Sequence, residues 1–156
     1  MTKKIIDLIE YKKLYKLKLK SKEIVHCHGV FDLLHIGHIR HLEEAKKNGE
    51  ILIVTITADK YVNKGFGRPF FNENLRAEAL SALACVDYVI INYTPAADII
   101  IKKIRSKYYV KGIDYKIDIK NDPNLKLEKK SINSVGGKLI LTSTVKFSSS
   151  NLINNF

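Results

Sequence analysis

The chain has 156 residues, 46% apolar and 28% charged, a balance typical of one soluble globular domain with its own core. It carries 27 Lys and Arg against 16 Asp and Glu, a formal charge of +11 that favours anionic partners such as phosphorylated small molecules. No run approaches the length of a membrane span, no signal peptide is evident, and the two cysteines suit a reducing compartment. We therefore expect a cytoplasmic protein that binds neither membrane nor nucleic acid.

Helices and strands are predicted to alternate along the chain. Apolar residues at helical spacing predict helices over 4–19, 36–49, 73–84, 95–106, 125–137 and 148–154. Short β-rich runs predict strands over 23–30, 51–57, 86–92, 108–112 and 138–143, and the loops at 64–72 and 113–123 are the longest. This pattern predicts an α/β fold, a three-layer, Rossmann-like, parallel five-stranded sheet with helices on both faces, built by residues 1–156 as a single domain.

All five histidines fall within sixteen positions, and two of them mark a candidate anion site. The segment "FDLLHIGH" (31–38) joins the first strand to its helix, so His35 and His38 lie at a helix N-terminus, where free N–H groups and the helix dipole attract anions. Gly37 between them allows a phosphate to approach the backbone. A zinc site on His35, His38 and His41 is the alternative, but no Cys or Asp/Glu spacing completes a known metal pattern, so no metal ligand is assigned.

The other histidines have different interpretations. His26 and His28 alternate with Cys27 on the first strand, so both are expected to point to one face. His26 is interpreted as a structural residue. His28 is closer to the strand end and near enough to reach the site, and its role stays open. His41 is one turn deeper in the helix, outside the chemistry.

The segment "GVFDLLHIGHIRHLEEAKKNG" (29–49) resembles the H-x-G-H signature of the nucleotidyltransferase superfamily of cytidylyltransferases and adenylyltransferases. The heptose 1-phosphate adenylyltransferase domain of bifunctional ADP-heptose synthases is similar over nearly the whole chain. Segments that recur there in the same order are "KGFGRPFFNENLRAEAL" (64–80), "VDYVI" (86–90), "VKGIDY" (110–115), "GGKLILT" (136–142) and "FSSSNLI" (147–153).

This resemblance implies transfer of a nucleoside monophosphate, with AMP favoured, from a nucleoside triphosphate to a sugar phosphate such as heptose 1-phosphate. Pyrophosphate is released, and Mg²⁺ accompanies the triphosphate. Glycerol-phosphate cytidylyltransferases share H-x-G-H and the terminal serine run, so CTP with a glycerol-phosphate-like or other small phosphorylated acceptor is the alternative. A homodimer is also implied, together with a sugar-kinase domain fused to this one in a larger kinase–nucleotidyltransferase protein.

The resemblance further implies residue roles. His35 and His38 would stabilise charge on the α-phosphoryl group, Lys64 would neutralise the triphosphate, and Arg76 would bind the β- and γ-phosphates. The implied nucleotide-binding residues are Gly29, Val30, Phe31, Asp32, Gly37, Lys111, Gly112, Asp114, Ser148, Ser149 and Ser150. Arg76 lies in the first turn of its helix, where the dipole disfavours a cation, so a bound anion would explain it; a pair with Glu73 or a neighbouring loop is the alternative.

Three departures from the family concern the substrate rather than the reaction class. Serines at 149 and 150 replace threonines, His28 replaces a small or amide residue, and the segment 116–135 is longer than its counterpart. A different hypothesis is a regulator that keeps the fold without the activity, suggested by the charge. The joint presence of the five residues that carry the chemistry argues against it: His35, Gly37, His38, Lys64 and Arg76.

Overall fold

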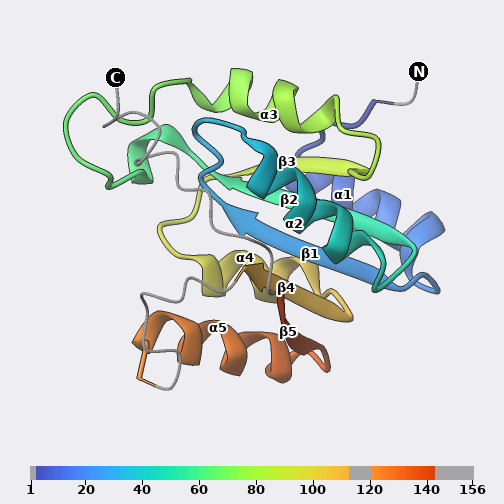
Figure 1. Cartoon of the computed structure of the whole chain (residues 1–156). Helices are drawn as coiled ribbons and strands as arrows, with labels where there is room; N and C mark the ends of the chain where they lie inside the picture. The colour runs from blue at the N-terminus through green and yellow to red at the C-terminus, as the bar shows by residue number, and fades with distance from the viewer. Residues whose placement is uncertain (1–2, 113–120, 143–156) are drawn as a thin grey trace.

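The computed structural model describes residues 3–112 and 121–142 as alternating strands and helices (Figure 1). The helices are α1 (Leu8–Leu14), α2 (Ile36–Lys46), α3 (Glu73–Ser81), α4 (Ala97–Ile104) and α5 (Pro123–Ser134). A π-helical turn, η1 (Tyr15–Leu19), continues α1, and a 3₁₀ turn, η2 (Asp59–Tyr61), follows the second strand. The strands are β1 (Ile24–Gly29), β2 (Ile51–Thr57), β3 (Tyr88–Asn92), β4 (Tyr108–Gly112) and β5 (Lys138–Thr142).

The five strands form one parallel sheet in the order β3-β2-β1-β4-β5. This confirms the predicted α/β fold class. The chain winds outward from β1 in both directions, so the winding reverses between β1 and β4. Ligands of such sheets bind at that reversal, outside the carboxyl ends of the strands.

The sheet buries a different set of side chains on each face. Val25 and Cys27 of β1 pack with Leu42 of α2 and with α3 in one apolar cluster. Ile24, on the opposite face of β1, packs with α1 and α4 in another, and Figure 1 shows α4 and α5 on the side of the sheet away from α3. Successive strand residues point to opposite faces, so the site residues can be assigned to one face or the other.

The prediction of a helix over 4–19 is wrong at its start. Ile6 donates its N–H to the carbonyl oxygen of Val89 at 3.0 Å, and Val89 donates to that of Lys4 at 2.9 Å, so the first residues run beside β3. The helix begins only after Asp7, whose carboxylate accepts the N–H groups of Ile9 and Glu10. Such a cap satisfies N–H groups that lack helical partners.

None of the helices in the described residues has the length and apolarity needed to cross a membrane.

The helix that carries the histidine pair should depend on one buried leucine. Leu42 is fully buried, so Leu42→Ala should lower the free energy of unfolding by about 2–5 kcal/mol through lost contacts and a cavity. Leu17→Ala, at a side chain that is 81% exposed, should change it by less than about 0.5 kcal/mol. Urea denaturation followed by circular dichroism measures both, and equal effects would contradict the assignment of α2 to the core.

Candidate active site

His35 and His38 form a stacked pair at the start of α2. Their ring centroids lie 3.9 Å apart, with an interplanar angle of 27°. His35 is the N-cap residue, and its Nδ1 accepts the N–H of Gly37 at 3.1 Å. In return, the N–H of His35 donates to Nδ1 of His38 at 3.4 Å. Because each Nδ1 accepts a backbone proton, each neutral ring carries its own proton on Nε2.

Both rings are electrically neutral at pH 7. Burial lowers the pKa of His38 to about 4, and the neighbouring His35 and the ammonium of Lys64 act in the same direction. Burial also lowers the pKa of His35. The pair therefore presents N–H donors at the positive end of a helix without adding charge of its own.

Asp32 joins the histidine loop to the glycine-rich loop at 64–71. Its side chain is buried, and one oxygen accepts the N–H groups of Phe70 and Phe71 at 2.7 and 3.1 Å. The other oxygen pairs with Nε of Arg68 at 2.6 Å. The carboxylate that was predicted to line the nucleotide pocket thus holds the second loop against the first.

Arg76 is buried, although the helix position alone favoured a bound anion. Its guanidinium directs four of its five N–H donors at acceptors among the described residues. The acceptors are the carbonyl oxygens of Val30, Thr57 and Phe71 and the carboxylate of Asp59. The alternative of a neighbouring-loop partner therefore describes the contacts seen, and phosphate binding by Arg76 stays a prediction.

Lys64 lies on the exposed loop at 64–71, near Arg68 and Arg76. Partial desolvation and the Arg68 guanidinium lower the pKa of its ammonium. The positive charge of Lys64 in turn lowers the pKa of His38. The structure thus brings Lys64, His35 and His38 to the same region of the sheet edge.

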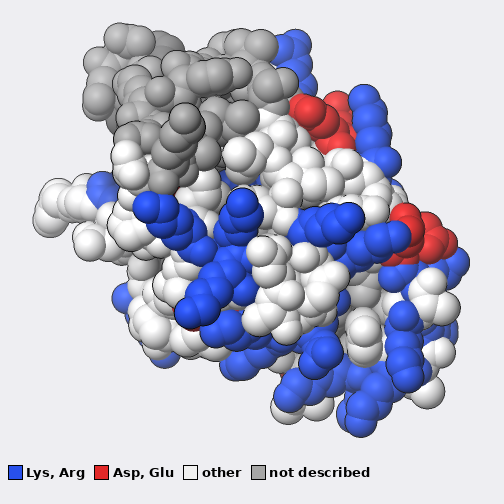
Figure 2. Space-filling view, turned by 90° about the horizontal axis from the view of Figure 1, so that it is seen from below, with Lys and Arg blue, Asp and Glu red and all other residues white. Residues whose placement is uncertain are grey.

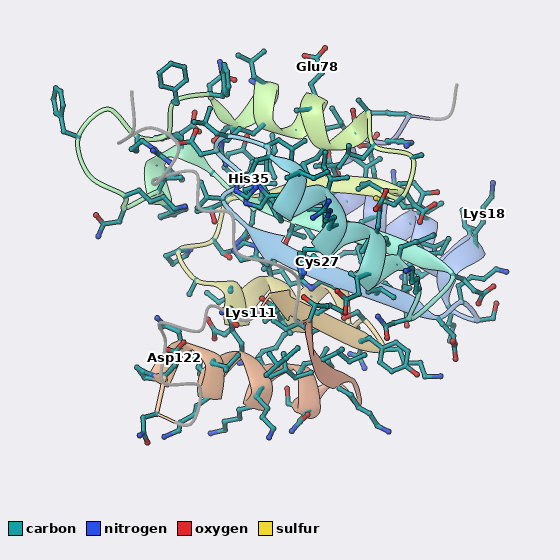
Figure 3. All side chains as sticks on the ribbon, in the orientation of Figure 1. Lys18, Cys27, His35, Glu78, Lys111 and Asp122 are labelled. Carbon is teal, nitrogen blue, oxygen red and sulfur yellow. The ribbon has the colours of Figure 1, made fainter. Side chains whose placement is uncertain are left out.

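Lys111 and Gly112 lie at the end of β4. The ammonium of Lys111 pairs with the Glu128 carboxylate of α5 at 2.6 Å, and Figure 3 shows Lys111 on the α5 side of the sheet, away from His35. A Cβ at Gly112 would lie 3.7 Å from Nδ1 of His41, which contacts the Thr142 hydroxyl at 2.7 Å. The predicted residues Asp114, Ser148, Ser149 and Ser150 lie outside the described residues.

Comparisons with known proteins place this site in a family. Residues 26–155 match the family model described as cytidylyltransferase-like. The chain belongs to the cytidylyltransferase-like family. It is a domain of the nucleotidyltransferase type, as its H-x-G-H segment predicted.

Similar curated proteins are longer than this family member. The bifunctional protein HldE of Geobacter metallireducens is 36% identical over 130 residues, covering 82% of this chain and 25% of that protein. HldE of Aliarcobacter butzleri is 39% identical over 133 residues, covering 84% of this chain and 28% of that protein. The chain therefore spans about a quarter of the length of these curated relatives.

Solved structures give the same fold at the scale of one domain. The lipopolysaccharide core biosynthesis protein of Thermoplasma volcanium is 30% identical with a TM-score of 0.67, covering 81% of this chain and all of that one. Pantothenate synthetase of Thermus thermophilus has a TM-score of 0.67 at 12% identity, and covers 96% of this chain and 67% of that one. The second likeness concerns the fold alone.

Three residues of this cytidylyltransferase-like domain escaped the sequence analysis. Thr55 is fully buried and contacts both His26 and His28, which confirms that these two histidines share a face. Its signal was a polar residue inside the apolar run 51–57. No local pattern in the sequence pointed to Asp59 or Glu128, since each pairs with a cation distant in sequence.

Acid should destabilise the domain through its buried histidines. Burial lowers the pKa of His28, His38 and His41 to about 4 each, against about 6.5 in an unfolded chain. Between these values the unfolded state binds more protons, so the free energy of unfolding should fall as the pH falls below 6.5, by up to about 1.4 kcal/mol per pH unit and histidine. Urea denaturation at pH 7.5, 6.5 and 5.5 measures the slope, which His41→Gln should reduce. A flat profile would contradict the burial of these rings.

Replacing Arg76 should affect the stability of the fold more than the binding of a nucleoside triphosphate. One ammonium cannot reach four acceptors, so Arg76→Lys should lower the free energy of unfolding by about 2–4 kcal/mol. Arg40→Lys, at an exposed position of α2, should change it by less than about 0.5 kcal/mol. Unchanged stability together with weaker binding of a nucleoside triphosphate would favour the predicted phosphate contact instead.

Proposed function

We propose that this domain transfers a nucleoside monophosphate, with AMP favoured, from a nucleoside triphosphate to a sugar phosphate such as heptose 1-phosphate. The observation that carries the proposal is the stacked His35–His38 pair at the N-terminus of α2, with Lys64 near it. The resemblance to heptose 1-phosphate adenylyltransferase domains supports a sugar phosphate as acceptor, and the name of the similar lipopolysaccharide core biosynthesis protein agrees with it. The family description favours the alternative, CTP with a glycerol-phosphate-like or other small phosphorylated acceptor.

The proposed reaction is one in-line displacement. A phosphate oxygen of the acceptor attacks the α-phosphorus, the bond to the β-phosphate oxygen breaks, and pyrophosphate leaves. The chain needs no covalent intermediate, so its contribution is to position the phosphates and stabilise their charge. Nε2–H of His35 and His38 would donate to phosphoryl oxygens, and the incoming negative charge would raise the pKa of both rings.

The loops around the pair supply the remaining contacts of the proposal. Lys64 would neutralise the triphosphate from its glycine loop, and Asp32 and Arg76 would hold that loop and the turn after β1 in register. The serines at 148–150 and Asp114 belong to the proposed nucleotide site through the resemblance alone.

Mg²⁺ fits the proposal as a companion of the triphosphate. In residues 3–112 and 121–142 no group of three His, Cys, Asp or Glu side chains could hold a metal ion, and Asp32 and Asp59 are each paired with an arginine. Phosphate oxygens and water suit this small hard cation, which would neutralise phosphate charge when bound. We assign no protein ligand to it.

The proposed partners follow from the relatives and the surface. A sugar-kinase domain on the same polypeptide is part of the proposal, since the chain spans about a quarter of HldE. A homodimer is part of the proposal through the resemblance alone. Lys and Arg side chains are spread across the face seen in Figure 2 rather than gathered in one stripe. A dispersed positive surface favours small anionic substrates over a nucleic-acid track.

The histidine pair should be needed for turnover more than for folding. Removing one donor to a transition-state charge lowers the rate by about 10²–10³-fold, which we expect for His35→Ala and His38→Ala. Arg40→Ala, on the exposed side of the same helix, is the matched control. Pyrophosphate release from a panel of ATP, CTP, GTP and UTP with sugar 1-phosphates and glycerol 3-phosphate measures activity and base choice together. Normal turnover of both histidine variants would refute the mechanism.

A further inference from the structure

A row of polar side chains crosses the sheet on the face opposite α2. In the strand register His28 of β1 is level with Thr55 of β2, and it is two residues beyond His26, which pairs with Tyr109 of β4. Lys111 is two residues beyond Tyr109 on the same face of β4, and its charge lowers the pKa of His28, so the two side chains lie near each other. Three adjacent strands therefore place a hydroxyl, an imidazole and an ammonium side by side at their carboxyl ends.

In the part of the chain that the structure describes, the imidazole of this row has one short hydrogen bond. Nδ1 of His28 lies 2.7 Å from the Thr55 hydroxyl, which also lies 2.8 Å from Nε2 of His26. Because this hydroxyl has a single proton to donate, at least one of the two rings donates to it. Within residues 3–112 and 121–142, the contact of His28 Nε2 is a long one, 3.4 Å, to the hydroxyl of Thr57. This nitrogen keeps hydrogen-bonding capacity at the strand end.

The ammonium of the row is held by a buried carboxylate. Glu128 is 7% exposed, yet its side chain comes from α5 to meet Lys111 at 2.6 Å. Burying such a pair carries a desolvation penalty that a solvated surface lysine avoids, and removing one partner is strongly destabilising. The side chain of Lys111 remains 30% exposed, so its other protons can meet a ligand.

The position of the row complements the histidine pair. His26 and His28 lie on the α4 side of β1, whereas Cys27 packs toward α2, whose N-terminus carries His35 and His38. Both groups lie at the carboxyl edge where the winding reverses. In an in-line displacement the attacking and leaving groups occupy opposite sides of the phosphorus. With the triphosphate at the histidine pair, the acceptor has to approach from another side.

The charge of the row indicates what it binds. Lys111 and Glu128 together are neutral, and the carboxylate disfavours a phosphate group beside it. A hydroxyl group matches the pair, because it can donate to the carboxylate and accept from the ammonium.

We propose that Lys111, Glu128 and Nε2 of His28 form the acceptor subsite and bind the hydroxyl groups of a polyhydroxylated phosphate ester. This proposal rests on the proposed nucleotidyl transfer, and it assigns Lys111 to the acceptor rather than to the nucleotide. Lys111 and Glu128 each contact a hydroxyl group of the acceptor, and Nε2 of His28 provides a third contact beside them.

Kinetics with two substrates test the subsite. The panel of acceptors is glycerol 3-phosphate, glucose 1-phosphate, mannose 1-phosphate and 2-deoxyglucose 1-phosphate, each titrated at saturating triphosphate. Glu128→Gln and Lys111→Met should raise the acceptor KM by about tenfold or more and leave the triphosphate KM within about twofold. Lys130→Met, exposed on the same helix, is the matched control and should change neither. Each variant is first shown to melt as one cooperative transition.

Other outcomes would overturn the assignment. A raised triphosphate KM with an unchanged acceptor KM would place Lys111 in the nucleotide site, and no change in either would make the pair structural. If no acceptor and triphosphate release pyrophosphate, the proposed function fails, and calorimetry then decides the subsite separately. Binding of glucose 1-phosphate to the native chain that is lost in Glu128→Gln would support the subsite, and no binding to the native chain would refute it.

Discussion

The carboxyl edge of the sheet depends on one buried cation. The guanidinium of Arg76 is 1% exposed and reaches the end of β1, the end of β2, the turn η2 and the loop before α3. A buried charge is tolerated only when it is paired and its donors are satisfied. Asp59 supplies the pairing, and its side chain is 37% exposed, so the negative partner keeps part of its hydration. The guanidinium therefore ties the turn after β1 and the loop before α3 to the end of β2 and to η2.

The turn after β1 needs this support because its backbone is strained. Phe31 has φ +50°, a left-handed conformation that costs a residue with a side chain about 1–2 kcal/mol. The neighbours on either side are both held: the carbonyl of Val30 by Arg76, and the carboxylate of Asp32 by the loop at 64–71. The Phe31 ring in turn packs against the His38 ring in an edge-to-face arrangement, with 5.2 Å between the ring centroids. Strain in the turn and the placement of the histidine are thus parts of one arrangement.

Local patterns in the sequence predicted the sheet and the histidine pair, because both depend on short-range rules. Alternating apolar runs specify parallel strands, and a Gly between two histidines at a helix start marks an anion site. The carboxylates that pair with Arg76 and Lys111, Asp59 and Glu128, were missed, since each lies 17 positions away from its cation and no periodicity links them. The strand-like start at residues 4–6 was missed because "KKII" fits a helix as well as a bridge to β3, and only tertiary packing decides between them.

Neutral histidines suit the proposed binding of a nucleoside triphosphate by a positively charged protein. Lys64, Arg68 and Arg76 already concentrate positive charge at this edge, and additional fixed cations would repel them in the free state. An imidazole with a lowered pKa supplies an N–H donor without that repulsion, and it can take up a proton when phosphate charge enters. The same low pKa makes the folded state resist protonation, so the property that suits the site at neutral pH also makes the domain sensitive to acid. Site chemistry and pH-dependent stability therefore have one physical origin, the burial of these rings.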